Sequence, residues 1–259
     1  MLMISRLVRY KDLLLVYIWR EFLIRYRQSV IGVLWALLQP ISMMLLFALV
    51  FGVILKTTHK DYPFALFFFA GILPWNFFSG TTNFSIGALS GNFHIITKIY
   101  FPREVIPLSG VAINFIDFLI GFFAFLLLIV FYGISFTWCF LWVFPLMALM
   151  VVFTASAALL LSSLNVYYRD VKLASTFVIQ LLFFATPVVY SIDHVDSHWK
   201  FILFLNPMTF IVENLRRVTL EGRPVVIWQF LVEAVIVCAL YVVIYKIFVR
   251  IERAFADVI

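Results

Sequence analysis

Long stretches without a charged residue dominate the sequence. The runs 28–55, 62–97 and 118–168 contain no Asp, Glu, Lys or Arg. A helix of about 20 such residues crosses the ~30 Å hydrocarbon core of a bilayer. A soluble protein of this length keeps a charged surface, yet only 12% of the residues in this chain are charged. The sequence therefore predicts an all-α integral membrane protein, a single transmembrane domain over 1–259 with about six transmembrane helices.

The apolar runs divide into successive spans. A helix over 62–97 would be about 54 Å long, so the second span is expected to end early or to break near Gly71, Pro74 or the polar stretch 79–83. Residues 132–135 form the best turn within 118–168, which makes spans three and four a tight hairpin. The predicted elements are an interfacial segment within 1–28 and spans at about 30–55, 63–88, 105–131, 137–163, 173–190 and 225–245.

The basic residues gather at the ends of the apolar runs. An even number of spans places both termini on one side, and most Lys and Arg side chains fall in segments on that side. The positive-inside rule makes this side cytoplasmic. The net charge of +6 then reflects topology and anionic membrane lipid, and no nucleic-acid partner is expected. Cys139 and Cys238 lie in apolar runs and are expected to be small buried hydrophobes.

Residues 19–28 have an amphipathic pattern. Trp19, Phe22, Leu23 and Tyr26 share one helical face, while the opposite face is polar and includes Glu21 and Arg25. This pattern predicts a helix that lies in the inner interface and anchors the chain. Arg20 and Glu21 follow the preceding apolar run where a cleavage site would need small residues, so a cleaved signal peptide is not expected.

Several short motifs occur in register along this topology. The first, RYRQSVIGVLW at 25–35, runs into LQP at 38–40. The others are GILPW at 71–75, KIYFPR at 98–103, NVYYRDV at 165–171, LNPM at 205–208 and FADVI at 255–259. In this order they resemble the polysaccharide and O-antigen export permeases, the Wzm-like transmembrane subunits of type-2 ABC exporters. The resemblance covers nearly the whole chain.

The resemblance implies a half-transporter in the bacterial inner membrane. Two copies would form the pore as a homodimer, and two copies of a separate nucleotide-binding ATPase would bind below. The implied cargo is a polyprenyl-linked glycan of O-antigen type, with capsule or teichoic acid export as close alternatives. The sequence has no G-x-x-x-x-G-K-[ST] phosphate loop. The chain is therefore expected to be a transport subunit without a cofactor of its own, and the partner would bind ATP and Mg²⁺.

The resemblance assigns ATPase coupling to the inner connection 91–103. A short helix there would start near Asn92, carry an apolar stripe and stop at Pro102, whereas an ordinary turn is the alternative. A second contact is expected at Arg169 and Asp170, unless these form a local ion pair that stabilises the turn. Glu21 and Arg25 are further candidates. The remaining coupling candidates are Ile95, Ile96, Lys98, Ile99, Phe101 and Arg103.

Asp117 and Asn114 share one face of span three. An ionisable group at membrane depth is a functional candidate by default. Three roles remain open for Asp117: lining a wet sugar pathway, bonding a neighbouring helix, or relaying protons. Aromatic planes pack against the C–H faces of sugars, and the resemblance implies an aromatic-lined path. Tyr26, Trp75, Phe77 and Phe78 are the candidates for that path.

The outer segment 200–222 is expected to form two short helices that break at Asn206 and Pro207. The resemblance suggests that they dip into the outer leaflet and gate the exit. Glu213, Arg216 and Arg217 would lie near that exit or pair with each other.

Two other classes of function remain as alternatives. A membrane enzyme of lipid-linked glycan synthesis would need clustered Asp, Glu or His, and the closest such group is 193–198, a possible metal site. A proton-coupled secondary transporter would normally show more spans and a repeat between its halves, and neither is visible here.

Overall fold

The computed structural model describes residues 9–27, 29–55, 62–96, 98 and 101–252. Within these ranges the regular elements are helical, as the apolar runs predict. In chain order they are α2 (Lys11–Tyr26), η1 (Gly32–Leu34), α3 (Trp35–Phe47), η2 (Ala48–Ile54), α4 (Phe64–Gly91), α5 (Phe93–Ile96), α6 (Val105–Phe131), η3 (Trp138–Trp142), α7 (Val143–Tyr167), α8 (Asp170–Ala185), η4 (Ile192–His194), α9 (Ser197–Phe204), α10 (Pro207–Thr219) and α11 (Ile227–Glu252).

Five helical segments of the described chain are long and apolar enough to cross a membrane. They are Gly32–Ile54, Phe64–Gly91, Val105–Phe131, Trp138–Tyr167 and Ile227–Glu252. All five correspond to spans predicted from the sequence. The expected hairpin between spans three and four is also confirmed, because a turn follows α6 and Gly133 adopts a φ of +70° there. Glycine reaches this left-handed conformation at little cost.

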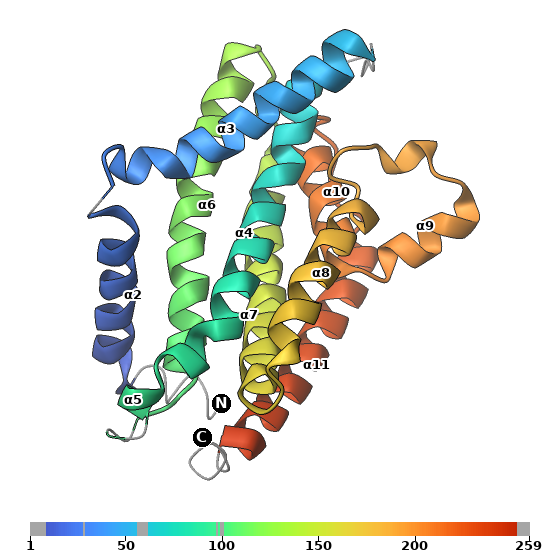
Figure 1. Ribbon diagram of the computed structural model, residues 1–259. Helices are drawn as coiled ribbons and strands as arrows, with labels where there is room; N and C mark the ends of the chain where they lie inside the picture. The colour runs from blue at the N-terminus through green and yellow to red at the C-terminus, as the bar shows by residue number, and fades with distance from the viewer. Residues whose placement is uncertain (1–8, 28, 56–61, 97, 99–100, 253–259) are drawn as a thin grey trace.

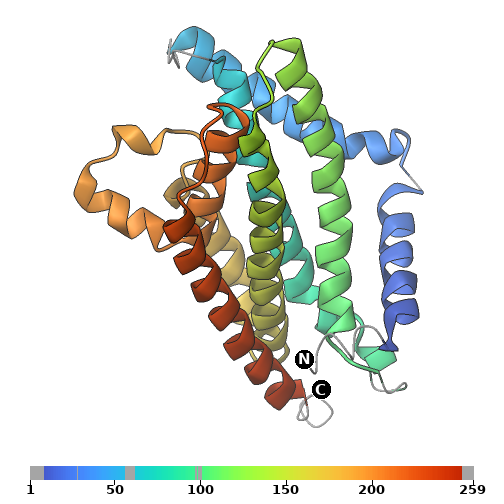
Figure 2. The same ribbon diagram turned by 180° about the vertical axis from the view of Figure 1, so that it is seen from behind.

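Helix α4 is the centre of the bundle. It packs against α3, α6, α7 and α10, and 78% of its most apolar 18-residue stretch is buried. Helix α11 runs along α7 at the opposite side of the bundle from α2, as the two views show (Figures 1 and 2). The segment α3–η2 crosses the other long helices obliquely. Both ends of the described chain lie at the end of the bundle that carries α5.

The second span ends early, at Gly91, which is one of the two expected outcomes, and it does not break at Gly71, Pro74 or 79–83. Helix α4 continues without interruption from Phe64 to Gly91 and contains Pro74. Proline removes one backbone donor, but neighbouring helices can accommodate this inside a membrane bundle. Burial on nearly every side of α4 provides such packing.

The predicted fifth span is shorter than expected. Helix α8 has 16 residues, which corresponds to about 24 Å against a core of ~30 Å. It ends at Ala185 because Thr186 precedes Pro187, and a residue before proline disfavours the helical conformation. The chain then turns, and α9 projects sideways from the bundle before α10 returns to it (Figure 1).

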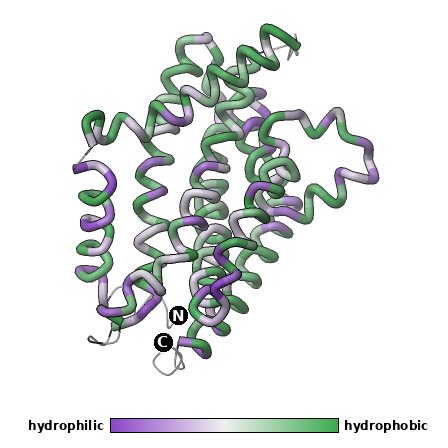
Figure 3. The backbone as a smooth tube through the Cα atoms, viewed as in Figure 1, coloured by the Kyte–Doolittle hydropathy of each residue, from purple (hydrophilic) through white to green (hydrophobic). Residues whose placement is uncertain are grey.

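Helix α2 does not have the predicted flat orientation. It packs on α6 and runs alongside it in both views, whereas a helix lying in the interface would cross the spans. Hydrophilic residues recur along its length (Figure 3). The expectation of buried cysteines is also wrong, since Cys238 is exposed and Cys139 is half-buried.

Candidate functional site

A polar pocket of about 550 Å³ lies between the end of α2, the start of α3 and the middles of α4 and α6. Its position follows from the fold, because α2 packs along α6 and the chain then turns over this gap into α3. The lining side chains belong to Arg25, Tyr26, Trp35, Ala36, Gln39, Pro40, Leu73, Asn76, Phe77, Ser79, Gly80, Asn83, Asn114, Asp117 and Phe118. Such a concentration of amides and charges among apolar helices makes this pocket the candidate functional site.

One ion pair joins α2 to α6 across this pocket. Arg25 Nη1 donates to Asp117 Oδ2, and it also donates to Asn114 Oδ1 at 3.3 Å. The Tyr26 hydroxyl donates to Asp117 Oδ1. Burial, followed by the bond to Asp117, raises the pKa of Tyr26 above its ordinary value. The phenol therefore stays protonated and remains a donor, so Asp117 accepts from both α2 side chains.

This geometry bears on two of the roles predicted for Asp117. Asp117 bonds a neighbouring helix and also lines a polar pocket, so these two roles are not alternatives. Arg25 lies in the pocket rather than on the face expected to meet an ATPase. Asn114 is buried, and its Nδ2 donates to Gly110 O at 2.8 Å within α6. The sequence placed Asn114 and Asp117 on one face correctly, but it did not link them to Arg25.

The aromatic candidates separate into two groups. Phe77 lines the pocket together with Tyr26. Trp75 and Phe78 are buried on another side of α4, where the Phe78 ring stacks on Phe153 with ring centroids 5.4 Å apart. The ring centroid of Trp75 lies 5.6 Å from that of Phe183 in α8. In this structure Trp75 and Phe78 therefore pack helices and do not face the pocket.

The inner connection contains a helix of only four residues, α5. Asn92 precedes it, but its side chain faces elsewhere: Nδ2 donates to Ala88 O at 2.8 Å, and Oδ1 accepts from Arg20 at 3.0 Å. Ile96 is buried in a cluster with residues of α2, α6 and α11, and Ile95 packs against the same cluster. Ile95 and Ile96 therefore pack inside this chain and do not project toward a partner.

The end of the connection is tied to α11. The Arg103 backbone N–H donates to Glu252 Oε1 at 3.0 Å, and the Arg103 guanidinium donates to Glu252 O. Phe101 and Pro102 are buried nearby, and the Phe101 ring lies 6.1 Å from that of Tyr17. These contacts tie the end of the connection to α2 and α11. Ile99 lies outside the described residues.

Other predicted coupling residues are exposed at the α5 end of the bundle. Lys98, Arg169 and Asp170 are all exposed. No ion pair joins Arg169 to Asp170 among the described residues, and Asp170 instead occupies the first turn of α8, where a carboxylate is favoured by the helix dipole. Glu21 is mostly buried and pairs with Arg20 at 2.7 Å.

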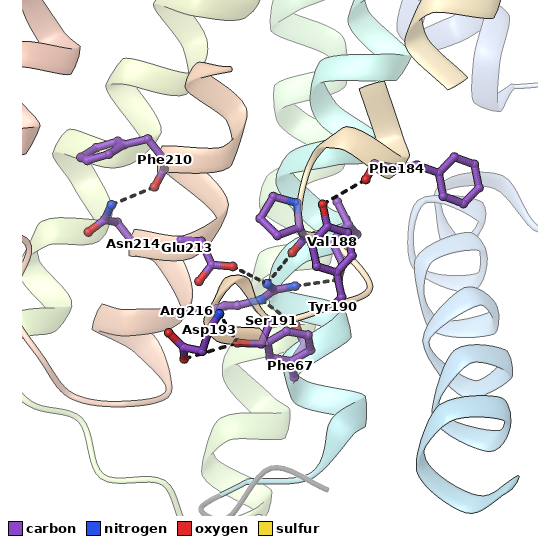
Figure 4. A network of polar contacts seen from close by, with 11 residues as sticks. Phe67, Phe184, Val188, Tyr190, Ser191, Asp193, Phe210, Glu213, Asn214 and Arg216 are labelled. Atoms are coloured by element: carbon purple, nitrogen blue, oxygen red, sulfur yellow. Dashed lines mark hydrogen bonds and ion pairs between the residues drawn. The ribbon is translucent and has the colours of Figure 1, made fainter. Parts of the chain in front are cut away.

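A second arginine lies at the other end of the bundle, fully buried. Arg216 of α10 donates from Nε to Phe67 O at 3.1 Å and from Nη2 to Val188 O at 2.6 Å. Its Nη1 donates to Pro187 O at 2.5 Å and to Glu213 at 3.0 Å. Figure 4 shows this fan of contacts, which joins α10 to α4 and to the loop after α8. Burial lowers the pKa of Arg216 and raises that of Glu213, and the opposite charge of each partner counters the shift.

Gly71 makes room for this guanidinium. A Cβ atom at position 71 would lie 2.4 Å from Arg216 Nη2 and 3.1 Å from Val188 O. The guanidinium also lies over the Phe67 ring, 3.6 Å from its centroid. The glycine in the GILPW motif therefore has a structural explanation, since any side chain there would displace Arg216.

The predicted break between the two outer helices is confirmed. Asn206 Oδ1 accepts from Met208 N at 3.0 Å as the N-cap of α10, and Pro207 occupies the first turn. Asn206 Nδ2 donates to Thr186 Oγ1 at 2.9 Å, which ties α10 to the end of α8. The predicted pairing of Glu213 with Arg216 is also confirmed. Arg217 is half-buried, and its Nε lacks a hydrogen-bond partner among the described residues.

The sequence missed several pocket residues. Gln39, Asn76 and Asn83 place amide groups there, and Ser79 adds a hydroxyl. Asn76, Ser79 and Asn83 follow each other at spacings of three and four, which puts them on one face of a helix. That spacing is the available signal, but the same polar stretch also predicts a weak point of the span. For the metal alternative, the described residues contain no group of three or more His, Cys, Asp or Glu that would hold an ion.

Comparison with known proteins gives a consistent picture. Residues 12–220 match the family described as ABC-2 type transporter. The chain is 33% identical over 224 residues to the O-antigen export system permease protein RfbA of Myxococcus xanthus, with 85% of each chain covered. It is 29% identical over 212 residues to RfbA of Klebsiella pneumoniae, covering 82% of this chain and 81% of the relative. The polysialic acid transport protein KpsM of Escherichia coli is 23% identical over 209 residues, with 78% and 79% covered.

Proposed function

The chain belongs to the ABC-2 type transporter family, and on that premise we propose that it is the permease subunit of an ABC exporter for lipid-linked polysaccharide. The cargo is a glycan of O-antigen type, carried from the cytoplasmic side across the inner membrane. The relatives named for O-antigen export cover most of the chain and support this cargo. The single observation that carries the proposal is the polar pocket among helices long enough to span the bilayer.

The membrane topology includes α8 as a sixth, shorter span, which joins the α9–α10 segment on the outer side. Helix α10 re-enters the bundle there, and its burial against α4 and α7 supplies the protein surroundings that such a segment needs within a bilayer. Both termini are cytoplasmic under the positive-inside rule. The α5 end of the bundle, where the described chain begins and ends, is then the cytoplasmic end.

The transporter is a homodimer that binds two copies of an ATPase at this cytoplasmic end. Lys98, Arg169 and Asp170 are the exposed candidates for that contact, because Ile96 and Phe101 are buried within the chain. ATP and Mg²⁺ belong to the partner. Reversing the charges of Lys98 and Arg169 together is expected to weaken co-purification of the ATPase, with no change in the unfolding midpoint of the permease.

The proposal is tested by removing this chain from its native host. Lipid-linked glycan is then extracted and assigned to one side of the inner membrane. Long polymer trapped on the cytoplasmic side, with none at the surface, is the expected result, and the chemistry of the polymer identifies the cargo as O-antigen or capsule. Absence of all polymer would indicate a synthetic role, and unchanged surface glycan would contradict the proposal.

A further inference from the structure

We propose that the pocket between α2, α3, α4 and α6 binds uncharged sugar residues of the exported chain, rather than the anionic diphosphate of its lipid carrier. This inference rests on the proposed function and specifies the part of the substrate that one protomer holds. It concerns a cavity lined by side chains from four helices of one chain.

The charge balance of the pocket argues against an anionic ligand. Arg25 is the one cation among the lining side chains, and its guanidinium already pairs with Asp117. A diphosphate is best held by unpaired cations or by several free N–H groups. Here it would meet a carboxylate and would have to displace that carboxylate from Arg25 before making its own contact.

The remaining polar groups suit hydroxyl groups. Asn76, Asn83 and Gln39 each carry both a donor and an acceptor, and Ser79 adds a hydroxyl that does both. Asn83 and Gln39 are exposed at the rim, while Asn76 is half-buried. A sugar hydroxyl is likewise both donor and acceptor, so these side chains match it without any net charge.

Aromatic rings supply the other half of a sugar site. Phe77 and Phe118 are buried in the wall, and Trp35 is 52% exposed at the opening. Rings of this kind offer flat apolar surfaces for the C–H faces of a pyranose. The volume of about 550 Å³ lies in the ~300–1,000 Å³ range of small-molecule sites, which suits a short segment of glycan and not a whole chain.

The depth of the pocket fits a transit site. Asp117 is 12 residues beyond Val105 at the start of α6, or about 18 Å along the helix axis. Ser79 lies near the middle of α4. Sugar residues bound here would therefore be held well inside the bundle.

Thiol protection tests this assignment. The S79C substitution is introduced into a C139S/C238S chain that is first shown to export glycan. Inner-membrane vesicles containing the permease and its ATPase are prepared from three hosts. One host makes the complete lipid-linked glycan, one makes only the sugar-free lipid diphosphate, and one makes neither. Labelling of the S79C chain by an uncharged, membrane-permeant maleimide is followed by mass spectrometry.

The expected result is labelling that is at least threefold slower with the complete glycan alone. The matched control is S90C, on the same face of α4 and about 16 Å further along, outside the pocket; its labelling is expected to be equal in all three preparations. If S79C impairs export, N83C at the rim replaces it. Protection by the sugar-free diphosphate would overturn the inference, and so would equal labelling in all three. Continued export in either case would leave the proposed function standing.

Discussion

Arg216 and Arg25 each pair with a carboxylate, but the two sites differ in burial and in the kind of group that accepts their remaining hydrogen bonds. Arg216 is 1% exposed and donates to three backbone carbonyls and one carboxylate. Arg25 has a side chain that is 33% exposed, and it contacts two side chains beside a cavity. Backbone carbonyls cannot rotate away, whereas Asn114 and Asp117 are side chains that can exchange partners. Arg216 therefore holds the fold, and Arg25 belongs to a surface that a substrate can occupy.

Removing Arg216 is expected to have the largest effect. In R216L, Glu213 loses its cation and three buried carbonyls lose a donor, which should destabilise the fold by about 3 kcal/mol or more. The unfolding midpoint and the yield of monodisperse protein would both fall. The neighbouring R217L variant provides the control. Arg217 is only half-buried and its Nε makes no hydrogen bond among the described residues, so its loss should change the midpoint much less. Equal effects from the two variants would break the comparison.

Adding a methyl group at one of two glycines in α4 tests the packing around Arg216 more closely. The added Cβ in G71A meets the guanidinium of Arg216, whereas in G87A it meets nothing within 4 Å. Overpacking should cost G71A about 1–3 kcal/mol. Alanine is the better helix former, so G87A should gain up to about 1 kcal/mol. Thermal unfolding of the two variants in one detergent would measure the opposite signs, and a tolerated G71A would contradict the structure.

Breaking the ion pair between Arg25 and Asp117 should have a smaller effect on stability. The cost of losing one residue should depend on whether the other is still present. D117N and R25Q are each expected to lower stability by about 1 kcal/mol, because the pair is partly exposed. The double variant should lose less than the sum, with a coupling of at least ~0.5 kcal/mol. Chemical unfolding of all four chains gives this coupling. Strict additivity would show that Arg25 and Asp117 do not interact.

The spans could be predicted from sequence because each depends on a local property, a run of uncharged residues. The turn at Gly133 and the break at Asn206–Pro207 were also local and correct. Helix α10 was harder, since Glu213, Arg216 and Arg217 indicate an outer polar segment. The structure buries Arg216 inside the chain, so this side chain is not an exposed loop charge.

The pocket could not be predicted because it depends on tertiary contacts. Arg25 is separated from Asp117 by 92 positions, and no periodicity connects them. The amphipathic pattern of α2 suggested a lipid interface, yet Arg25 from its polar face and Tyr26 from its apolar face both bond to Asp117 of α6. The polar stretch 79–83 was interpreted as a possible break, although α4 stays helical and directs Ser79 and Asn83 into the cavity. In each case a polar group whose surroundings depend on tertiary packing was interpreted as a local feature.

The most direct test of this account is export per folded molecule in N76L and G71A chains, compared with the original chain in a host that lacks its own copy. Surface glycan is divided by the amount of folded permease in the membrane. N76L is expected to keep its level and its unfolding midpoint while export per molecule falls at least tenfold. G71A is expected to lose folded protein while export per folded molecule stays unchanged. Undiminished export by N76L would contradict the claim that the pocket carries substrate.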